Sequence, residues 1–336
     1  GMDRYFQIAR CYRDEDARGD RQPEFTQLDL EMSFVSRDDV FTVIEGMLRH
    51  VFREVMRIDL PVPFPRLAYE DAMNRYGSDK PDLRYALEMR DFGPLAARSA
   101  FDTFRAVLES GGVVRALVAP GCATYSRAQI AELEEAARTY GARGLAWMKV
   151  TGAGLDGGVA RFFKDLGGDV QEALGASPGD LILAVAGPWK TACTALGAVR
   201  SRLGRALGLA EAGRFAFSWI VDFPLFEWNE ESRTWDPAHH MFTMPQERYL
   251  DALETDPGSV KGDLYDLVCN GNELASGSIR IHDPELQKRV FRVVGMTDEE
   301  AERRFGFLLE VFRYGAPPHG AVSYTHLRAH ETPEHL

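Results

Sequence analysis

The stretch YFQIARCYRDEDARGDRQPEFTQLDLEMSF, residues 5–34, decides how this chain folds. Its two ends are rich in aromatic and apolar residues. They flank a charged segment, residues 13–24, which carries both signs of charge together with a glycine and a proline. This pattern predicts two strands of a hairpin joined by a long loop, and such loops commonly carry function.

The second of these strands alternates without a break, so it has two different faces. An exposed face of an antiparallel sheet is the simpler interpretation of the polar side. The loop favours a binding site instead, because its arginines stand among five carboxylates and can hold a polyanion. The face predicted to be polar contains Phe25, Gln27, Asp29, Glu31 and Ser33, the face predicted to be core contains Thr26, Leu28, Leu30, Met32 and Phe34, and the loop arginines are Arg13, Arg18 and Arg21.

The string RCYRDEDARGDRQPEFTQLDLEMSF, residues 10–34, resembles motif 2 of class II aminoacyl-tRNA synthetases, in the form found in bacterial aspartyl-tRNA synthetases. The resemblance implies an α+β fold, with an antiparallel catalytic sheet flanked by helices. It also implies that Arg13 holds the α-phosphate of ATP, that Phe25 stacks on adenine, and that Glu15 contacts either the adenine or the tRNA end. Asp29 then binds the ammonium group of the amino acid, and Gln27 completes the pocket.

Composition limits the other function classes. A chain of 336 residues with 45% hydrophobic residues suggests two or three domains with real cores. The net charge of −12 has the wrong sign for a general nucleic-acid binder, so RNA must be held by local basic patches and DNA is not an expected partner. Four scattered cysteines without a CxxC pair argue against zinc and disulfides.

The same survey of the sequence predicts a location. No apolar run reaches membrane-spanning length, and the N-terminus lacks the form of a signal peptide. We therefore expect a cytoplasmic protein without a membrane partner. The chain begins at Gly1-Met2 and enters a strand almost at once, which suggests a piece of something longer.

Four segments are expected along the chain. Residues 1–96 form the first part of the catalytic domain, and residues 214–320 form the second part, which ends where motif 3 begins. Between them, residues 97–213 alternate predicted strands and helices, which indicates a small α+β domain without a chemical cluster. This insertion resembles the GAD domain of bacterial aspartyl-tRNA synthetases. Residues 321–336 are polar and histidine-rich, and we expect them to be an unrelated tail.

The segment DPAHHMFTMP, residues 236–245, contains two adjacent histidines. On an extended backbone His239 and His240 point in opposite directions, so they cannot form a two-histidine metal site by themselves. Loop histidines are often plain surface residues. The resemblance implies instead that this pair lies over the amino-acid end of the pocket.

A second hairpin is predicted by Asn270-Gly271, the strongest short-range turn signal. With these two residues as the turn, Cys269 faces Asn272, Val268 faces Glu273, and Asp266 faces Ala275. Asp266 and Glu273 then share one face as diagonal neighbours, and two such carboxylates can converge on Mg²⁺. In the family, the matching acidic residues bind the magnesium of ATP.

Arg280 follows in the string SGSIRIH. Counting by twos from Glu273 places Arg280 on the opposite face, so it reaches the pocket only if residues 275–277 contain a bulge. By resemblance this arginine grips the side-chain carboxylate of aspartate with a bidentate geometry that lysine cannot copy.

The resemblance implies an aspartate–tRNA ligase that uses ATP and Mg²⁺, with L-aspartate and tRNA-Asp as substrates and a homodimer as the full-length form. Whether tRNA-Asn is also charged stays open. After YGAPPHG, residues 314–320, we expect the motif 3 strand and its arginine to be absent, so this fragment should activate aspartate poorly. The alternatives are an asparaginyl or lysyl ligase, a non-catalytic paralogue that binds ATP or tRNA, and an acidic metal-binding protein. Arg280 and the GAD-like insertion argue against lysine.

Overall fold

The computed structural model describes residues 3–12, 14, 23–315 and 319–324. Contacts between residues divide the chain into two compact units. The first contains Gly1–Tyr69 and Phe217–Leu336, and the second contains Glu70–Ala216. In the described part of the chain, no helix combines the length and the apolar character that crossing a membrane requires.

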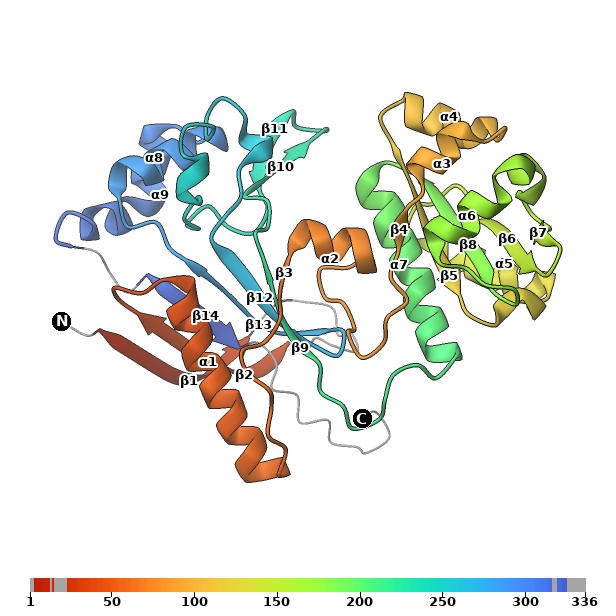
Figure 1. The fold of residues 1–336 in the computed structure, drawn as a ribbon. Coiled ribbons are helices and arrows are strands. Elements are labelled where there is room, and N and C mark those ends of the chain that lie inside the picture. The colour runs from red at the N-terminus through yellow and green to blue at the C-terminus, as the bar shows by residue number, and fades with distance from the viewer. Residues whose placement is uncertain (1–2, 13, 15–22, 316–318, 325–336) are drawn as a thin grey trace. The chain divides into compact units, whose positions relative to one another are not determined.

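The first unit is built on a seven-stranded sheet, in which β1 and β3 are the edges (Figure 1). All neighbouring strands are antiparallel except β3 and β9, which are parallel. In spatial order the strands are β1 (Arg4–Tyr12), β2 (Glu24–Met32), β14 (Gly320–Tyr324), β13 (Asn272–Ile279), β12 (Leu264–Cys269), β9 (Phe217–Val221) and β3 (Arg66–Ala68). This mostly antiparallel sheet agrees with the fold class expected from the sequence.

The predicted first hairpin is present, and β1 pairs with β2 from Arg4 opposite Met32 to Tyr12 opposite Glu24. The expected core face is only partly correct. Met32 is buried, but Phe34 is 84% exposed. Phe34 lies beyond the end of β2 with a φ of +57°, so the strand alternation no longer applies to it.

The prediction that no strand follows residue 320 is wrong for residues 321–324, the first part of the expected tail. These residues belong to β14, which pairs with β13 on one side and with β2 on the other. The strand that the sequence analysis expected to be missing is therefore present in the middle of the sheet. The physical reason is that the backbones of β2 and β13 would otherwise present unpaired edges to each other. The remaining residues of the predicted tail lie outside the described part.

Helix α1 (Arg37–Val51) covers one face of this sheet, and it continues into a short π-helical turn, Phe52–Met56. It begins with a capping box between Ser36 and Asp39. The ring of Phe41 stacks on Trp219 with centroids 4.2 Å apart, and it meets the edge of Tyr265 at 4.9 Å. Trp219 and Tyr265 belong to β9 and β12, so α1 buries the face of the sheet that carries these two rings.

Smaller elements complete the first unit. Figure 1 shows α8 and α9 side by side near the β10–β11 hairpin, and α8 is in contact with α9. Their apolar residues form two clusters, one of which contains Phe291, Met296 and Leu309. The bounds are α8 (Pro284–Val293), α9 (Asp298–Val311), β10 (Phe226–Asn229) and β11 (Thr234–Pro237), with short 3-10 turns at Glu247–Tyr249 and Pro257–Ser259.

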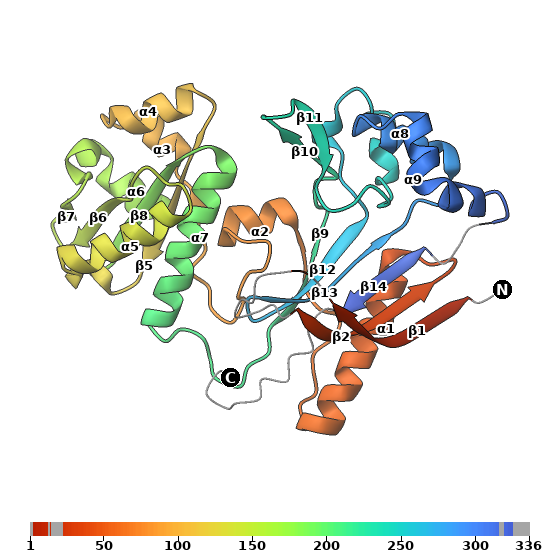
Figure 2. The ribbon, with the colours of Figure 1, turned by 180° about the vertical axis from the view of Figure 1, so that it is seen from behind.

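The second unit contains a five-stranded antiparallel sheet in the order β4-β5-β8-β6-β7 (Figure 2). Helices α3, α4 and α6 share one apolar core cluster with β5, β6 and β8, while α7 packs on β5 and β8 and on α5. The strands are β4 (Arg90–Asp91), β5 (Val113–Ala119), β6 (Ala146–Thr151), β7 (Gly154–Asp156) and β8 (Leu181–Gly187). The helices are α2 (Tyr69–Tyr76), α3 (Gly93–Arg98), α4 (Asp102–Glu109), α5 (Arg127–Thr139), α6 (Gly167–Leu174) and α7 (Trp189–Ala206), with 3-10 turns at Cys122–Thr124 and Ala160–Leu166.

This unit starts earlier than the boundary at residue 97 expected from the sequence, because the segment between α2 and β4 packs on α7. Gly77 and Gly197 lie so close that a Cβ on Gly197 would stand 2.4 Å from the Gly77 carbonyl oxygen. The β4 strand also pairs with β5. Residues 70–96 therefore share their contacts with the inserted sheet, although their sequence looked like part of the catalytic domain.

Candidate active site

The face of the first sheet opposite α1 brings the predicted acidic residues together. Asp29 of β2 and Ser276 of β13 both stand opposite residue 323 of β14. Ser276 in turn stands opposite Asp266 of β12. Directly opposed residues share a face of a sheet, so Asp29 and Asp266 lie on the same face. Trp219 and Tyr265, which pack on α1, belong to the other face by the same alternation.

Strand β2 contributes a small hydrogen-bonded network to this face. The Gln27 amide donates to Oδ1 of Asp29 at 3.4 Å, and Gln7 donates to Oδ2 of Asp29 at 3.3 Å. The Cys11 thiol donates to Oε1 of Gln27 at 3.0 Å. Phe25 is half-buried on the same side. Gln7 and Cys11 were not predicted to be site residues, although alternation along β1 was a signal that could have found them. Arg13 and Glu15 lie outside the described residues.

The β12–β13 hairpin has the predicted turn. Asn270 and Gly271 both have positive φ, at +52° and +84°, as expected of a type I′ turn. Cys269 faces Asn272 and Val268 faces Glu273, as predicted. The predicted pairing of Asp266 with Ala275 is wrong, because Ala275 faces Leu267 and Asp266 faces Ser276.

The difference arises from a β-bulge at Leu274. The register shifts between Leu267 and Val268, so that Leu274 has no partner across the strand. The position of Arg280 predicts a bulge within residues 275–277, and the structure has it one residue earlier. After the bulge, the alternation of β13 reverses. Glu273, Asp266 and Arg280 therefore share one face, with Asp266 and Glu273 as diagonal neighbours.

The two carboxylates of the hairpin differ in exposure. Asp266 is 5% exposed, whereas Glu273 is half-buried. Within the residues that the structure describes, no group of three or more histidine, cysteine, aspartate or glutamate side chains could hold a metal ion. These two carboxylates could supply two oxygen ligands to a hard cation such as Mg²⁺, which would take its other ligands from water or from phosphate.

Arg280 is held at the end of β13 by its backbone. Its N–H donates to the His319 carbonyl at 2.7 Å, and it forms an isolated bridge with Thr243. Burial lowers the pKa of its guanidinium, while Tyr265, Glu31 and Asp29 act in the opposite direction. An arginine remains charged under such opposing influences. The strand register places Arg280 on the same face of the sheet as Asp29 and Asp266.

The side chain of His240 contacts the Arg280 guanidinium. Its Nε2 lies against Nη1 of Arg280, and its Nδ1 accepts the N–H of Phe242 at 3.2 Å. Burial, Arg280 and His239 lower the pKa of His240 to about 3, so the ring is neutral at pH 7. A neutral imidazole has one accepting nitrogen, yet two donors face this ring. An anionic group beside Arg280 would accept the hydrogen bonds that the ring cannot.

His239 and His240 diverge, as the sequence predicts for adjacent residues. His239 is exposed, and its ring meets the face of Phe223 edge-on with centroids 5.2 Å apart. His240 is half-buried against Arg280. The structure therefore brings His240 into the site, together with Arg280, and turns His239 toward solvent.

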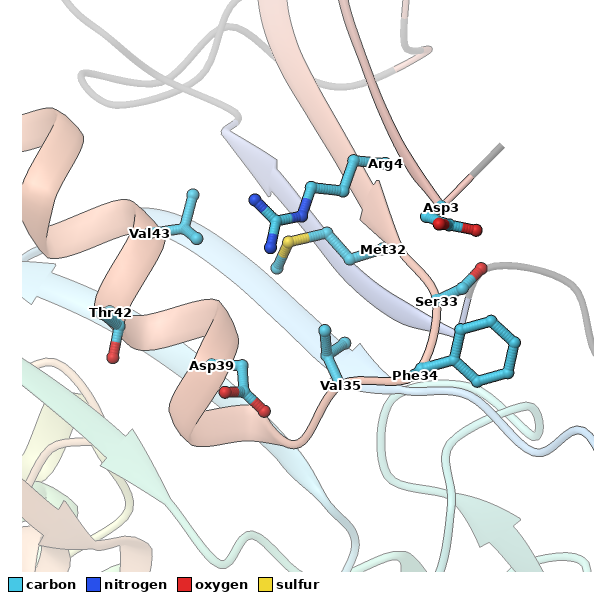
Figure 3. Close-up of a pocket in the computed structure, with 9 residues that line it drawn as sticks. All are labelled: Asp3, Arg4, Met32, Ser33, Phe34, Val35, Asp39, Thr42 and Val43. Carbon is cyan, nitrogen blue, oxygen red and sulfur yellow. The ribbon is translucent and has the colours of Figure 1, made fainter. Parts of the chain in front are cut away.

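A pocket of about 450 Å³ lies between the β1–β2 hairpin and α1 (Figure 3). Arg4 and Met32 reach toward its middle from the strands, and Val43 faces it from α1. It contains none of the predicted site residues, and the alternation of β2 places Met32 on the face opposite Asp29. The pocket is lined by Asp3, Arg4, Met32, Ser33, Phe34, Val35, Asp39, Thr42 and Val43.

Comparison with known families agrees with this arrangement. The family model described as tRNA synthetases class II (D, K and N) matches residues 1–328. The chain belongs to this family. The matched residues include all of β14. This agrees with the position of β14 inside the sheet of this class II synthetase chain.

Three relatives are similar to this class II synthetase chain. The Aspartate--tRNA(Asp/Asn) ligase of Treponema denticola is 59% identical over 326 residues, which is 96% of this chain and 55% of that protein. The ligase of the same name from Rubrobacter xylanophilus is 54% identical, again over 96% of this chain and 54% of the relative. The Aspartate--tRNA ligase of Macrococcus caseolyticus is 48% identical over 96% of this chain and 55% of its own length. The chain thus spans about half the length of these relatives.

Proposed function

We propose that this chain carries the catalytic domain of an aspartate–tRNA ligase. Such an enzyme activates L-aspartate with ATP to aspartyl-adenylate and transfers the aspartyl group to tRNA-Asp. One observation carries the proposal: Arg280, whose guanidinium contacts the His240 ring, lies on the same sheet face as Asp29 and Asp266. Membership of the family and the names of the relatives support it.

The residues of this face match the charges of the substrate. Free aspartate has one ammonium and two carboxylate groups. Arg280 supplies a forked donor for the side-chain carboxylate, and Asp29 supplies an anion for the ammonium. Gln27 orients Asp29 through its hydrogen bond. His240 carries its proton on Nε2, because its Nδ1 accepts the Phe242 N–H, so it can donate a hydrogen bond to the substrate. His239 covers the outer rim.

ATP is the second substrate in this proposal. Arg13 holds its α-phosphate, Phe25 stacks on its adenine, and Glu15 contacts the adenine or the tRNA end. Asp266 and Glu273 hold a Mg²⁺ ion that neutralises phosphate charge. No covalent protein nucleophile is needed, because positioning and charge stabilisation can carry phosphoryl-group chemistry.

The partners beyond the site follow from the same proposal. We infer that the RNA substrate is tRNA-Asp. We include tRNA-Asn as an additional substrate, because two of the relatives are named Aspartate--tRNA(Asp/Asn) ligase. The full-length enzyme acts as a homodimer. The GAD-like inserted domain expected at residues 97–213 corresponds to the second unit, Glu70–Ala216, whose separate antiparallel sheet supports this part of the proposal.

Aspartate-dependent exchange between ATP and pyrophosphate tests the activity. We would measure it on this chain and on a version extended to the full length of the Treponema denticola relative. We expect exchange with aspartate, at least in the extended version, and its loss in Arg280→Ala and Glu273→Ala. Arg304→Ala on α9, whose side chain pairs with exposed Glu300, is the control that should retain exchange. Exchange with asparagine or lysine but not aspartate would overturn the specificity. No exchange in the extended version with any of the three would overturn the ligase assignment.

A further inference from the structure

Helix α8 carries one polar residue on its buried face. Its buried residues are Gln287, Val290 and Phe291, and Gln287 is 0% exposed. A glutamine at this position is not required by helix packing, since an apolar residue would fill the same space. Burial of an amide is favourable only where its polar atoms find partners. The contacts of this amide therefore indicate why it is there.

The Gln287 amide has one hydrogen bond among the described residues. Its Nε2 donates to the carbonyl of Met241 at 2.8 Å, while its Oε1 is buried without a hydrogen-bond partner there. A buried acceptor without a donor costs free energy. Methionine in its place would remove this unpaired acceptor but would leave the Met241 carbonyl without the amide donor, so the hydrogen bond to Met241 is what the amide contributes here.

The Met241 carbonyl belongs to the peptide group whose N–H binds His240. That N–H is on Phe242, and it donates to Nδ1 of His240 at 3.2 Å. A trans peptide group is planar, so its carbonyl and its N–H point in opposite directions. An amide that fixes the carbonyl also fixes the direction of the N–H.

The neighbouring backbone is held on its other side by β13. Ile281 N–H donates to the Phe242 carbonyl, and Met244 N–H donates to the Ile279 carbonyl, both at 2.8 Å. The ring of Phe242 meets Phe305 edge-on with centroids 5.2 Å apart. These contacts fix the Phe242 carbonyl and side chain, but they leave the peptide between Met241 and Phe242 to be oriented by Gln287.

We propose that Gln287 is a positioning residue that holds the His240 ring against Arg280 by fixing the Met241–Phe242 peptide. The consequence for amino-acid binding rests on the proposed function. The consequence for the geometry of His240 is independent of the proposed function. The Gln287 amide on α8 does not contact substrate. It thereby determines how the hydrogen-bond donors of His240 and Arg280 are arranged.

The test replaces Gln287 with methionine, which has a similar length and no amide. Lys288→Met is the matched control, because Lys288 is the adjacent residue of α8 and its Nζ donates to Oε1 of exposed Glu285 at 2.9 Å. The first measurement is the ¹⁵N spectrum of the histidine rings in the protein without ligands. We expect the two His240 nitrogens to shift in Gln287→Met and to stay in place in Lys288→Met, with the thermal midpoint of each variant within about 3 °C of the parent. Unchanged His240 nitrogens in a folded Gln287→Met protein would overturn the proposal.

The second measurement is aspartate-dependent exchange in the extended protein. Gln287→Met should raise KM for aspartate about tenfold, while kcat and KM for ATP change by less than about twofold, which corresponds to about 1.4 kcal/mol of amino-acid binding. A merely structural role would lower activity with all substrates together and would overturn the proposal. If the ligase assignment itself failed, the ring spectra would still decide the role of Gln287. If Gln287→Met did not fold, Gln287→Asn, whose amide cannot reach the Met241 carbonyl, takes its place in both measurements.

Discussion

The imidazole of His240 lies against the guanidinium of Arg280, although the two residues are 40 positions apart in the sequence. An isolated histidine would be half protonated near pH 6.5. Beside the half-buried guanidinium of Arg280, the protonated ring would place two positive charges together in a poorly solvated site. This contact therefore determines both the charge of His240 and the way in which the site responds to pH.

The first prediction concerns stability at mildly acidic pH. The pKa of His240 is about 3 in the folded chain, below the ordinary value near 6.5 expected in the unfolded chain. Between these values the unfolded chain binds one more proton, so the free energy of unfolding falls as the pH decreases from about 6.5. From pH 7 to pH 5, His240 should cost about 2 kcal/mol. Urea unfolding of the parent and of His240→Gln at both pH values measures this, and equal losses in the two proteins would contradict it.

The second prediction concerns the shape of the Arg280 side chain. Arg280→Lys keeps the charge but loses the forked pair of donors that matches a carboxylate. Losing one charge-assisted hydrogen bond costs about 1.5–3 kcal/mol, so KM for aspartate should rise about 10- to 100-fold in the extended protein. KM for ATP should stay within about twofold. A lysine variant with unchanged KM for aspartate would show that Arg280 does not bind the substrate carboxylate.

The third prediction concerns a buried carboxylate in the first unit. Glu45 of α1 is 5% exposed, and its Oε1 accepts the Trp219 indole N–H at 2.9 Å and the Phe64 backbone N–H at 3.2 Å. Glu45→Ala leaves two buried donors unpaired and should lower the free energy of unfolding by about 2–4 kcal/mol. Glu45→Gln keeps the accepting oxygen and should cost less than about 1 kcal/mol. Thermal or urea unfolding compares the two, and similar losses would show that the carboxylate charge matters more than its acceptor role.

Local features of the fold could be predicted from the sequence. The Asn270-Gly271 turn was predictable because its two residues tolerate positive φ, and it fixed the first two pairs of the β12–β13 hairpin. The capping box of Ser126 and Gln129 is present at the start of α5, and Thr297 caps α9 through the N–H of Glu300. These signals depend on neighbours within a few residues of one another.

Long-range features could not be predicted in the same way. The strand β14, with the sequence GAVSY, was missed because its formation depends on the open edges of β2 and β13, which lie far from it in the sequence. The bulge was required by the position of Arg280, but its place at Leu274 depends on packing against β12. The contact between His240 and Arg280 depends on tertiary structure alone. The same is true of the hydrogen bond from the Gln287 amide to the Met241 carbonyl.

The buried cation of the second unit is a further feature without a local signal. Arg200 of α7 is 1% exposed, and it donates to the carbonyls of Leu87, Asp82, Tyr85 and Ala86 at 2.8–3.0 Å. Its guanidinium also lies over the rings of Tyr76 and Tyr85 at 4.9 and 4.3 Å. One side chain thus fastens the segment that precedes β4 to the helix of the inserted sheet.

The fourth prediction is that this segment depends on Arg200 for its order. Arg200→Met removes a buried guanidinium that bonds four carbonyls, and it should lower the free energy of unfolding of the second unit by about 3 kcal/mol. Arg200→Lys offers fewer donors in a different geometry and should give an intermediate loss. Arg202→Met removes only an exposed pair with Glu132 and should cost less than about 1 kcal/mol. Hydrogen exchange of residues 82–91 measures the effect directly. Faster exchange there in Arg200→Met and not in Arg202→Met is expected, and equal exchange in the two variants would mean that the glycine contact of Gly77 with Gly197, rather than the cation, holds the segment on α7.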